Sequence, residues 1–116
     1  MRTVELKKDW EKIETDFSIR FGGGEHMDVD AILFILGVQE VGQGHRTYKK
    51  NEKVDLIHVA ICRVLEPYGY YTYEGTDEQG WPHYSVNEAL PFLKAGEQAL
   101  LIKEAIVTYC KENDWI

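Results

Sequence analysis

The chain has 116 residues, of which 44% are hydrophobic, so it has the size and composition of one domain that buries a core. Lys and Arg number 13 against 20 Asp and Glu, which gives a formal net charge of -7. This balance excludes the general basic footprint of nucleic-acid-binding proteins, and an anionic membrane surface would repel the chain. We therefore expect a single domain, residues 1–116, with neither nucleic acid nor a membrane as partner.

The cysteines and the N-terminal sequence indicate the compartment. Cys62 and Cys110 each lie within a predicted helix and lack the spacing of a metal site, so we expect reduced structural thiols. Residues 1–8 contain no apolar core of the kind found in secretory signals. Together these features predict a cytoplasmic protein.

An amphipathic helix is predicted from about Val4 to Arg20, because apolar residues recur there at three- and four-residue spacings. That stripe consists of Leu6, Trp10, Ile13, Phe17 and Phe21. The glycine triplet 22–24 ends the helix. Such a triplet before a helix is typical of phosphate-binding loops, but the acidic residues that open the next helix would repel a phosphate. We interpret the triplet as a connector.

The most apolar stretch of the chain starts at Val29 and is predicted as a central buried helix. Up to Val38 it contains one charged residue, Asp30. Continuous apolarity fits a buried strand as well as a buried helix, but the pattern continues to Val41 and its length favours a helix. Asp28 is a suitable N-cap, and the glycines after Val41 are suitable stops.

A cationic segment follows in residues 42–51. Its basic side chains, together with Lys53 just after it, are His45, Arg46, Lys49, Lys50 and Lys53. This is the one cationic cluster of an acidic chain, so an acidic or phosphorylated ligand is one interpretation. A solvated loop is the other interpretation, and it is the one we favour.

A third helix is predicted from about Glu52 to Leu65, and Pro67 limits its end. Apolar residues cover one broad side of it: Val54, Ile57, Ile61, Val64 and Leu65. Others lie elsewhere on its circumference: Leu56 and Val59. The helix should therefore be largely buried, with Arg63 as the more exposed position.

Two aromatic-rich runs, 68–74 and 81–86, flank an acidic loop bounded by glycines and predict one β-hairpin. Pro82 places the second run at a sheet edge or at the start of a strand. Because two strands alone are marginally stable, one face of the hairpin must pack on helices. Its aromatic side chains either cap the helical core or form a recognition surface. On the second interpretation the binding residues are Tyr71, Tyr73, Trp81 and His83.

The last helix is predicted from about Gly96 to Glu112. Its inner face consists of Ala99, Ile102, Ala105, Ile106, Tyr109 and Cys110. Leu100 and Val107 project from another side, and they form either a second core contact or a dimer seam. We expect Trp115, near the end of the chain, to fold back.

These elements predict an α+β fold that is mainly α. Two central buried helices, the second and the third, form a core that two amphipathic helices, the first and the last, cover. One β-hairpin lies between the third and fourth helices of this four-helix core.

The strongest signal of a site is charge inside the apolar helices. Asp30 lies on the same side of its helix as Gly37, which removes a side chain and lets another helix approach closely. On the third helix Asp55, His58 and Cys62 share one strip. If these two sides face each other, a carboxylate–imidazole pair is buried between them, either for packing or for function.

Two chemistries could use such a pair. The candidate metal ligands are His26, Asp30, Asp55 and His58; the spacing Asp55-x-x-His58 occurs in helix-bundle metal sites, but the second copy that such sites have is missing. The candidate catalytic residues are Asp30, His58 and Cys62. However, the apolar, mid-helix setting of Cys62 raises its pKa rather than lowering it.

We therefore expect a small acidic cytoplasmic protein that is a non-catalytic adaptor or regulatory module, and we expect no cofactor. Its partner would be another protein or a second copy of itself in a homodimer. The alternative is a metal-binding or acid/base enzyme with a site around Asp30, Asp55 and His58.

Overall fold

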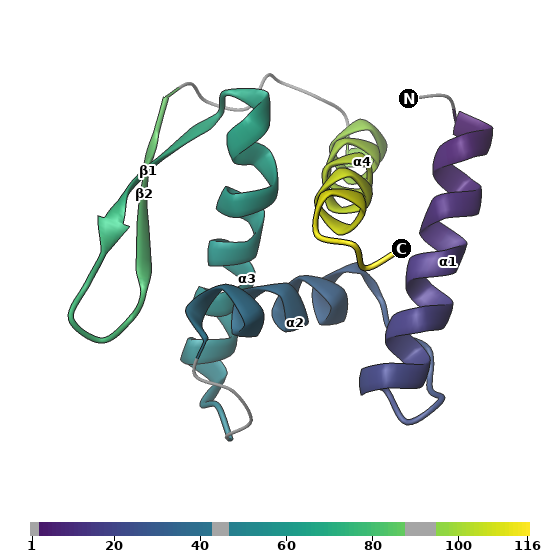
Figure 1. The fold of residues 1–116 in the computed structure, drawn as a ribbon, viewed down its shortest axis with the longest axis horizontal. Helices are drawn as coiled ribbons and strands as arrows, with labels where there is room; N and C mark the ends of the chain where they lie inside the picture. Colours follow the sequence, from purple (N-terminus) through teal and green to yellow (C-terminus); the bar gives the residue numbers. More distant parts are fainter. Residues whose placement is uncertain (1–2, 43–46, 88–94) are drawn as a thin grey trace. The chain divides into compact units, whose positions relative to one another are not determined.

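The computed structural model describes residues 3–42, 47–87 and 95–116. Across these residues the chain is α+β and mainly α, with four α-helices and one antiparallel hairpin between the third and fourth helices, as predicted (Figure 1). The elements are α1 (Thr3–Phe21), α2 (Val29–Val41), α3 (Lys50–Leu65), the 3-10 helix η1 (Glu66–Tyr68), β1 (Tyr71–Thr76), β2 (Pro82–Val86) and α4 (Ala95–Glu112). None of these helices is long and apolar enough to cross a bilayer.

The described residues group into two compact units, 3–32 with 95–116 and 33–42 with 47–87. The prediction of a single domain stays a prediction. Residues 43–46, which include His45 and Arg46 of the predicted cationic segment, lie outside the described residues. The sequence also predicts a turn from Asn87 to Leu93, around Pro91, and residues 88–93 of it lie outside the described residues.

In the first unit, α1 packs against α4. The predicted stripe of α1 is buried from Leu6 to Phe17, whereas Phe21 at its end is partly exposed. The ring of Trp115 lies 5.2 Å from that of Phe17 and 6.0 Å from that of Phe21, so the chain end folds back as predicted. An ion pair of 2.9 Å between Lys111 Nζ and an Asp9 carboxylate oxygen also joins the two helices.

The predicted inner face of α4 is only partly correct. Ala105, Ile106, Tyr109 and Cys110 are buried, but Ala99 is exposed. The two alternatives for Leu100 and Val107, a second core contact or a dimer seam, are also resolved. The side chain of Val107 is 0% exposed, and that of Leu100 is 47% exposed. Val107 is therefore a core residue, and the two residues do not form one exposed seam.

The glycine triplet after α1 is a helix terminator. The N–H groups of Gly22 and Gly24 donate to the Ser18 carbonyl at 3.1 and 2.9 Å, and Gly23 and Gly24 have φ values of 63° and 91° that favour glycine. These amides point back into α1, which supports the connector interpretation. After the turn, Asp28 caps α2 by accepting the N–H of Ala31 at 2.8 Å, as predicted.

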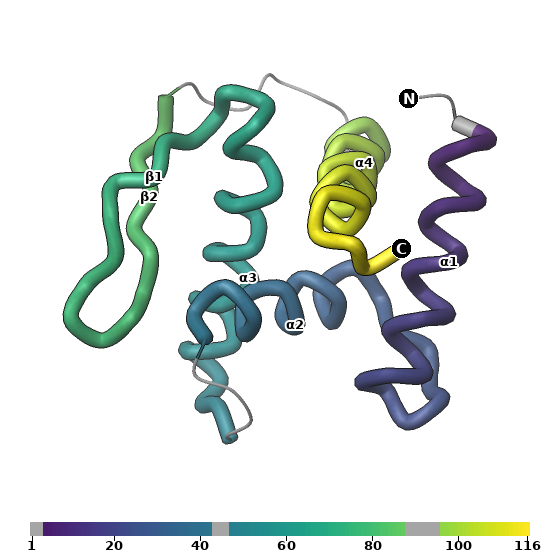
Figure 2. The backbone as a smooth tube through the Cα atoms, viewed as in Figure 1, coloured from purple at the N-terminus to yellow at the C-terminus, as the bar shows by residue number. Residues whose placement is uncertain are grey.

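In the second unit, the carboxyl-terminal part of α2 packs closely on α3. A Cβ added at Gly37 would overlap the backbone carbonyl of Leu56, so the two helices meet backbone to backbone. The close helix approach predicted at Gly37 is thus confirmed, and its partner is Leu56. The trace in Figure 2 shows α2 crossing α3 near this point.

The buried side of α3 differs from the prediction. Leu56 and Val59 are buried, whereas Val54 is 61% exposed. The reason is that the helix is apolar around most of its circumference, so its sequence does not fix which side meets α2; the Gly37 contact fixes it at Leu56. The expectation that Arg63 is the more exposed position is also wrong, because its Nε lies 3.0 Å from the Glu40 carboxylate and its side chain is largely covered.

Candidate functional site

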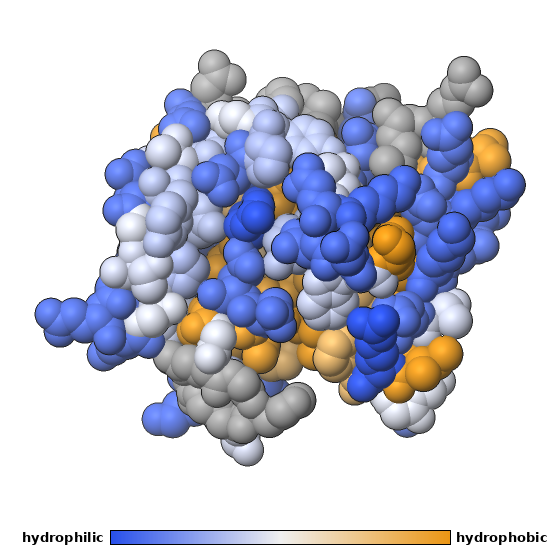
Figure 3. Space-filling view, viewed as in Figure 1, coloured by the Kyte–Doolittle hydropathy of each residue, from blue (hydrophilic) through white to orange (hydrophobic). Residues whose placement is uncertain are grey.

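The two strands of the hairpin pair antiparallel beside α3 (Figure 1). Tyr71 lies opposite Val86, and Tyr73 lies opposite Tyr84. The register shifts between Tyr73 and Gly75, so one extra residue, Glu74, bulges from β1. Pro82 opens β2, as predicted. In the face of the molecule that Figure 3 shows, the surface over the hairpin is mostly pale to blue, so polar and aromatic side chains rather than aliphatic ones cover it.

The loop between the strands is organised by Asp77. One oxygen of its carboxylate accepts the backbone N–H groups of Gln79 at 2.9 Å and Trp81 at 3.0 Å. The other oxygen lies 2.8 Å from Nε2 of His83. The hydrogen bond from His83 and the N–H of Trp81 together lower the pKa of Asp77, because both stabilise the ionised carboxylate.

Trp81 anchors this loop on the helices of the same unit. It packs against a cluster of buried residues from α2, α3 and the segment before α3: Val41, Tyr48, Leu56 and Val59. The interpretation that the hairpin aromatics cap a helical core is therefore correct for Trp81. Tyr73, by contrast, is 46% exposed and makes an edge contact with the ring of Tyr84 at 5.7 Å.

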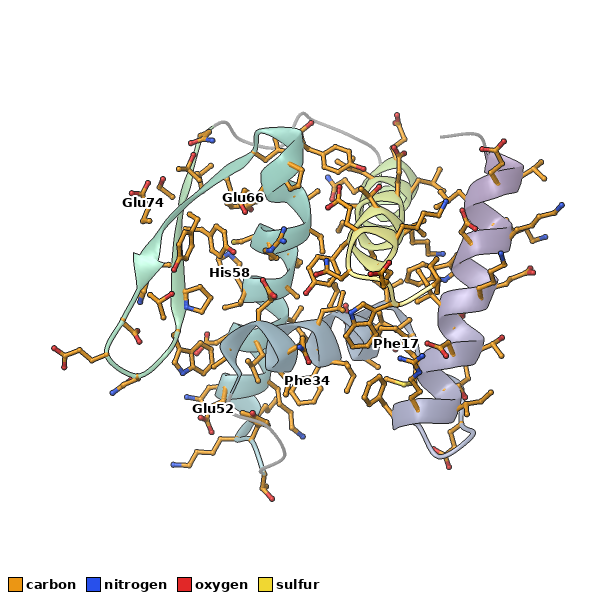
Figure 4. All side chains as sticks on the ribbon, viewed as in Figure 1. Phe17, Phe34, Glu52, His58, Glu66 and Glu74 are labelled. Carbon is orange, nitrogen blue, oxygen red and sulfur yellow. The ribbon has the colours of Figure 1, made fainter. Side chains whose placement is uncertain are left out.

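An open cleft of about 420 Å³ lies between α3 and the hairpin, and we call it the α3–hairpin cleft. Its lining residues are Glu52, Asp55, His58, Val59, Asp77, Gln79, Trp81, Pro82 and His83. Figure 4 shows His58 on the side of α3 next to the hairpin, with Glu52 nearer the start of the helix. Four of the residues singled out in the sequence, Asp55, His58, Trp81 and His83, thus meet at one cleft.

His58 is exposed in this cleft, so the prediction that its imidazole is buried between the helices is wrong. Its ring stands edge-on to that of Tyr71 at 6.5 Å, and Nε2 lies 3.8 Å from the sulfur of Cys62. Cys62 itself is buried, and burial raises its pKa to about 11. The predicted direction of this pKa shift is confirmed. The thiol is protonated at neutral pH and is not poised as a nucleophile.

The carboxylates of the cleft differ in the hydrogen bonds and ion pairs that they make within the protein. The side chain of Asp55 makes no hydrogen bond and no ion pair with any residue in the described ranges. Glu52 accepts the backbone N–H of Lys49 at 3.0 Å and so caps α3. Asp77 accepts hydrogen bonds from two backbone N–H groups of the loop and from His83. Asp55 is therefore the carboxylate most available to an incoming group.

Asp30 has a different environment from the one predicted. It is exposed on the first turn of α2 and belongs to the other unit. Since no polar or charged side chain is buried anywhere in residues 3–42, 47–87 and 95–116, the predicted buried carboxylate–imidazole pair is wrong. The error arises because an apolar neighbourhood in sequence does not determine which way one turn of a helix faces.

The metal candidates do not gather into a ligand set. His26 is exposed, and its Nε2 lies 3.6 Å from a carboxylate oxygen of Glu14 on α1. Within the part of the chain that the structure covers, no three His, Cys, Asp or Glu side chains are arranged to hold a metal ion. Asp55 and His58 share the α3–hairpin cleft, but Asp30 and His26 are exposed in the other unit.

A second open cleft, of about 320 Å³, adjoins the first at Pro82, which lines both. The second cleft is lined by Glu40, Arg63, Glu66, Tyr73, Thr76, Pro82 and Tyr84. Burial, together with the negative charges of Glu66 and Glu40, raises the pKa of Tyr84 to about 12. The only cation at this cleft among the described residues is Arg63, and Glu40 pairs with it.

The sequence did not indicate Glu52, Asp77 or Gln79 as site residues. An Asp at the start of a glycine-bounded loop is a signal for a side chain that accepts loop N–H groups, and it would have identified Asp77. Comparisons of the chain with protein-family models, with curated proteins and with solved structures found no match. Among the described residues, the side chains that line the α3–hairpin cleft offer carboxylates, imidazoles, an amide and an indole but no hydroxyl, thiol or amine.

Proposed function

We propose that this chain is a non-catalytic protein-binding module that accepts a cationic segment of a partner protein in the α3–hairpin cleft. The observation that carries the proposal is the composition of the cleft. Three carboxylates from α3 and the hairpin loop share the cleft with Trp81, and no Lys or Arg of the described residues lines it. As part of the same proposal, the module acts as an adaptor or regulator in the cytoplasm.

The charges of the cleft favour an arginine or lysine side chain. Glu52, Asp55 and Asp77 give it three negative charges while its imidazoles are neutral. Exposed ion pairs contribute about 0.2–1 kcal/mol each, so the cleft supports modest affinity that falls as salt is added. An aromatic ring adds an attractive surface for a guanidinium or ammonium group.

The cleft is also held in place before a partner arrives. Trp81 is fixed by its packing on buried side chains of α2 and α3. The loop is fixed by the hydrogen bonds to Asp77. A preformed site loses less conformational entropy on binding than a mobile one, so less of the interaction energy of each contact is lost to ordering the site.

One observation favours a second candidate, acid–base chemistry. The bond between Asp77 and His83 fixes an imidazole in the way that catalytic carboxylates do. Among the described residues, however, no hydroxyl, thiol or amine side chain lines the cleft, and no group of His, Cys, Asp and Glu side chains is arranged to hold a metal ion. The binding function uses the three carboxylates and the indole of the cleft and is the one we prefer.

Calorimetric titration with the peptide acetyl-Arg-Gly-Arg-Gly-Arg-amide tests the proposal. We expect binding at pH 7.5 and 50 mM NaCl that weakens at 300 mM NaCl, and no binding of the matched peptide with Glu in place of Arg. Asp55→Asn should weaken the affinity about threefold. Asp30→Asn removes one exposed carboxylate from the other unit and is the matched control. Equal losses in the two variants would show that only net charge matters and would reject the cleft.

A further inference from the structure

We infer that the α3–hairpin cleft is proton-controlled: protonation of His58 and His83 weakens the binding of a cationic segment there. This inference rests on the proposed function and adds its regulation. The observation behind it is that α3 and β2 each contribute one exposed imidazole to the same cleft. Histidine is the side chain whose charge ordinarily changes between pH 5 and 8.

The groups that face His58 are acidic or neutral. On α3 they are Glu52 and Asp55, together with the buried thiol of Cys62. From β1 the ring of Tyr71 contacts it. The hairpin loop and β2 contribute Asp77 and His83 to the same cleft. No Lys or Arg of the described ranges lines the cleft, so among these residues the imidazoles are the groups that can bring positive charge to it.

His83 acts on the cleft in two ways when it takes up a proton. Its own positive charge repels a cationic ligand. Its bond to Asp77, at 2.8 Å, also becomes an ion pair, which engages one of the three carboxylates more strongly. With both imidazoles protonated, the formal charge of the cleft changes from -3 to -1.

The same coupling must work in reverse. Because binding and protonation are linked, a cationic ligand that binds the cleft must expel protons from it. The number of protons released can be measured by calorimetry in buffers of different ionisation enthalpy. This readout needs only the unaltered protein and therefore does not depend on whether any variant folds.

The experiment is titration with acetyl-Arg-Gly-Arg-Gly-Arg-amide at pH 7.5 and pH 5.5. We expect the affinity to fall about fivefold at the lower pH, with proton release on binding at pH 6.5. The variant His58→Gln/His83→Gln should bind equally at both pH values and release no protons. His26→Gln, which alters an exposed histidine of the other unit, should behave like the unaltered protein.

The outcomes separate the inference from the proposed function. Binding that is the same at both pH values, with no proton release, overturns proton control and leaves the binding function intact. Absence of binding at pH 7.5 overturns both. A pH dependence that persists in the double histidine variant also overturns the inference, because other groups would then carry it.

Discussion

Gly37 of α2 lies against the backbone carbonyl of Leu56 of α3, so close that a Cβ at position 37 would also stand 3.1 Å from the Leu56 Cα. The two helices therefore touch through their backbones at this point. Such an approach is possible only where one helix lacks a side chain. This contact positions the side of α3 that carries Leu56 against α2 and leaves His58 and Asp55 on the side that lines the cleft.

Gly37→Ala should destabilise the second unit by about 3 kcal/mol, because the added methyl group must push two backbones apart. Helix propensity alone predicts the opposite sign, a gain of about 1 kcal/mol. Urea denaturation followed by circular dichroism measures the difference. The control is Gly96→Ala in α4, where an added Cβ meets nothing within 4 Å. A Gly37→Ala variant as stable as Gly96→Ala would contradict the close approach.

Trp81→Ala should lower the free energy of unfolding by about 2 kcal/mol, since the indole packs on a buried cluster that includes Leu56 and Val59. Tyr73→Ala, at an exposed position of the same hairpin, should have a much smaller effect. Chemical denaturation of both variants tests this. Comparable losses would mean that Trp81 is not the anchor of the hairpin.

Protonation of Asp77 should be controlled by His83. The pKa of Asp77 lies below its ordinary value of 3.8, so its stabilising effect is complete above pH 3.8 and is lost as the pH falls through the lower value. His83→Gln removes the largest cause and should move the carboxyl titration of Asp77, followed by carbon NMR, back towards 3.8. His58→Gln should leave it unchanged. An identical titration curve in His83→Gln would rule out this pairing in solution.

Alkaline pH should destabilise the protein through its buried thiols. The pKa of Cys62 rises from 9.0 to about 11 on folding because burial disfavours the thiolate. Its neutral form therefore supports the fold fully below pH 9, and this support is lost as the pH rises towards 11. One such group contributes a slope of up to about 1.4 kcal/mol per pH unit. Cys62→Ala should show a shallower fall in the free energy of unfolding over this range, and an unchanged slope would argue against the buried thiol.

Much of the fold follows from local sequence signals. The Asp28 cap, the length of the apolar run in α2 and the turn residues of the hairpin each act over a few neighbouring residues, and the structure confirms them. These local signals do not determine which side of α3 is buried, because a helix that is apolar on most sides has no single preferred face. The sequence pattern therefore places Val54 in the core, whereas its side chain is exposed.

The candidate site was predictable only in pieces. Asp55 and His58 were grouped by their spacing on a helix, and Trp81 and His83 by their place in an aromatic strand. That all four line one cleft depends on how the hairpin folds onto α3, which no local pattern encodes. Asp30 would join these residues only if a helix of mostly apolar residues were buried on every side. Asp30 is exposed, so it is not part of the candidate site.

The central claim is that the α3–hairpin cleft is the surface that meets a partner. Amide chemical-shift mapping by NMR, with the protein titrated by acetyl-Arg-Gly-Arg-Gly-Arg-amide at pH 7.5, tests it directly. Binding at the cleft predicts the largest shift changes in residues 52–59 and 77–83, together with the indole N–H of Trp81. Shift changes concentrated in residues 3–32 and 95–116, or none at saturating peptide, would contradict the claim.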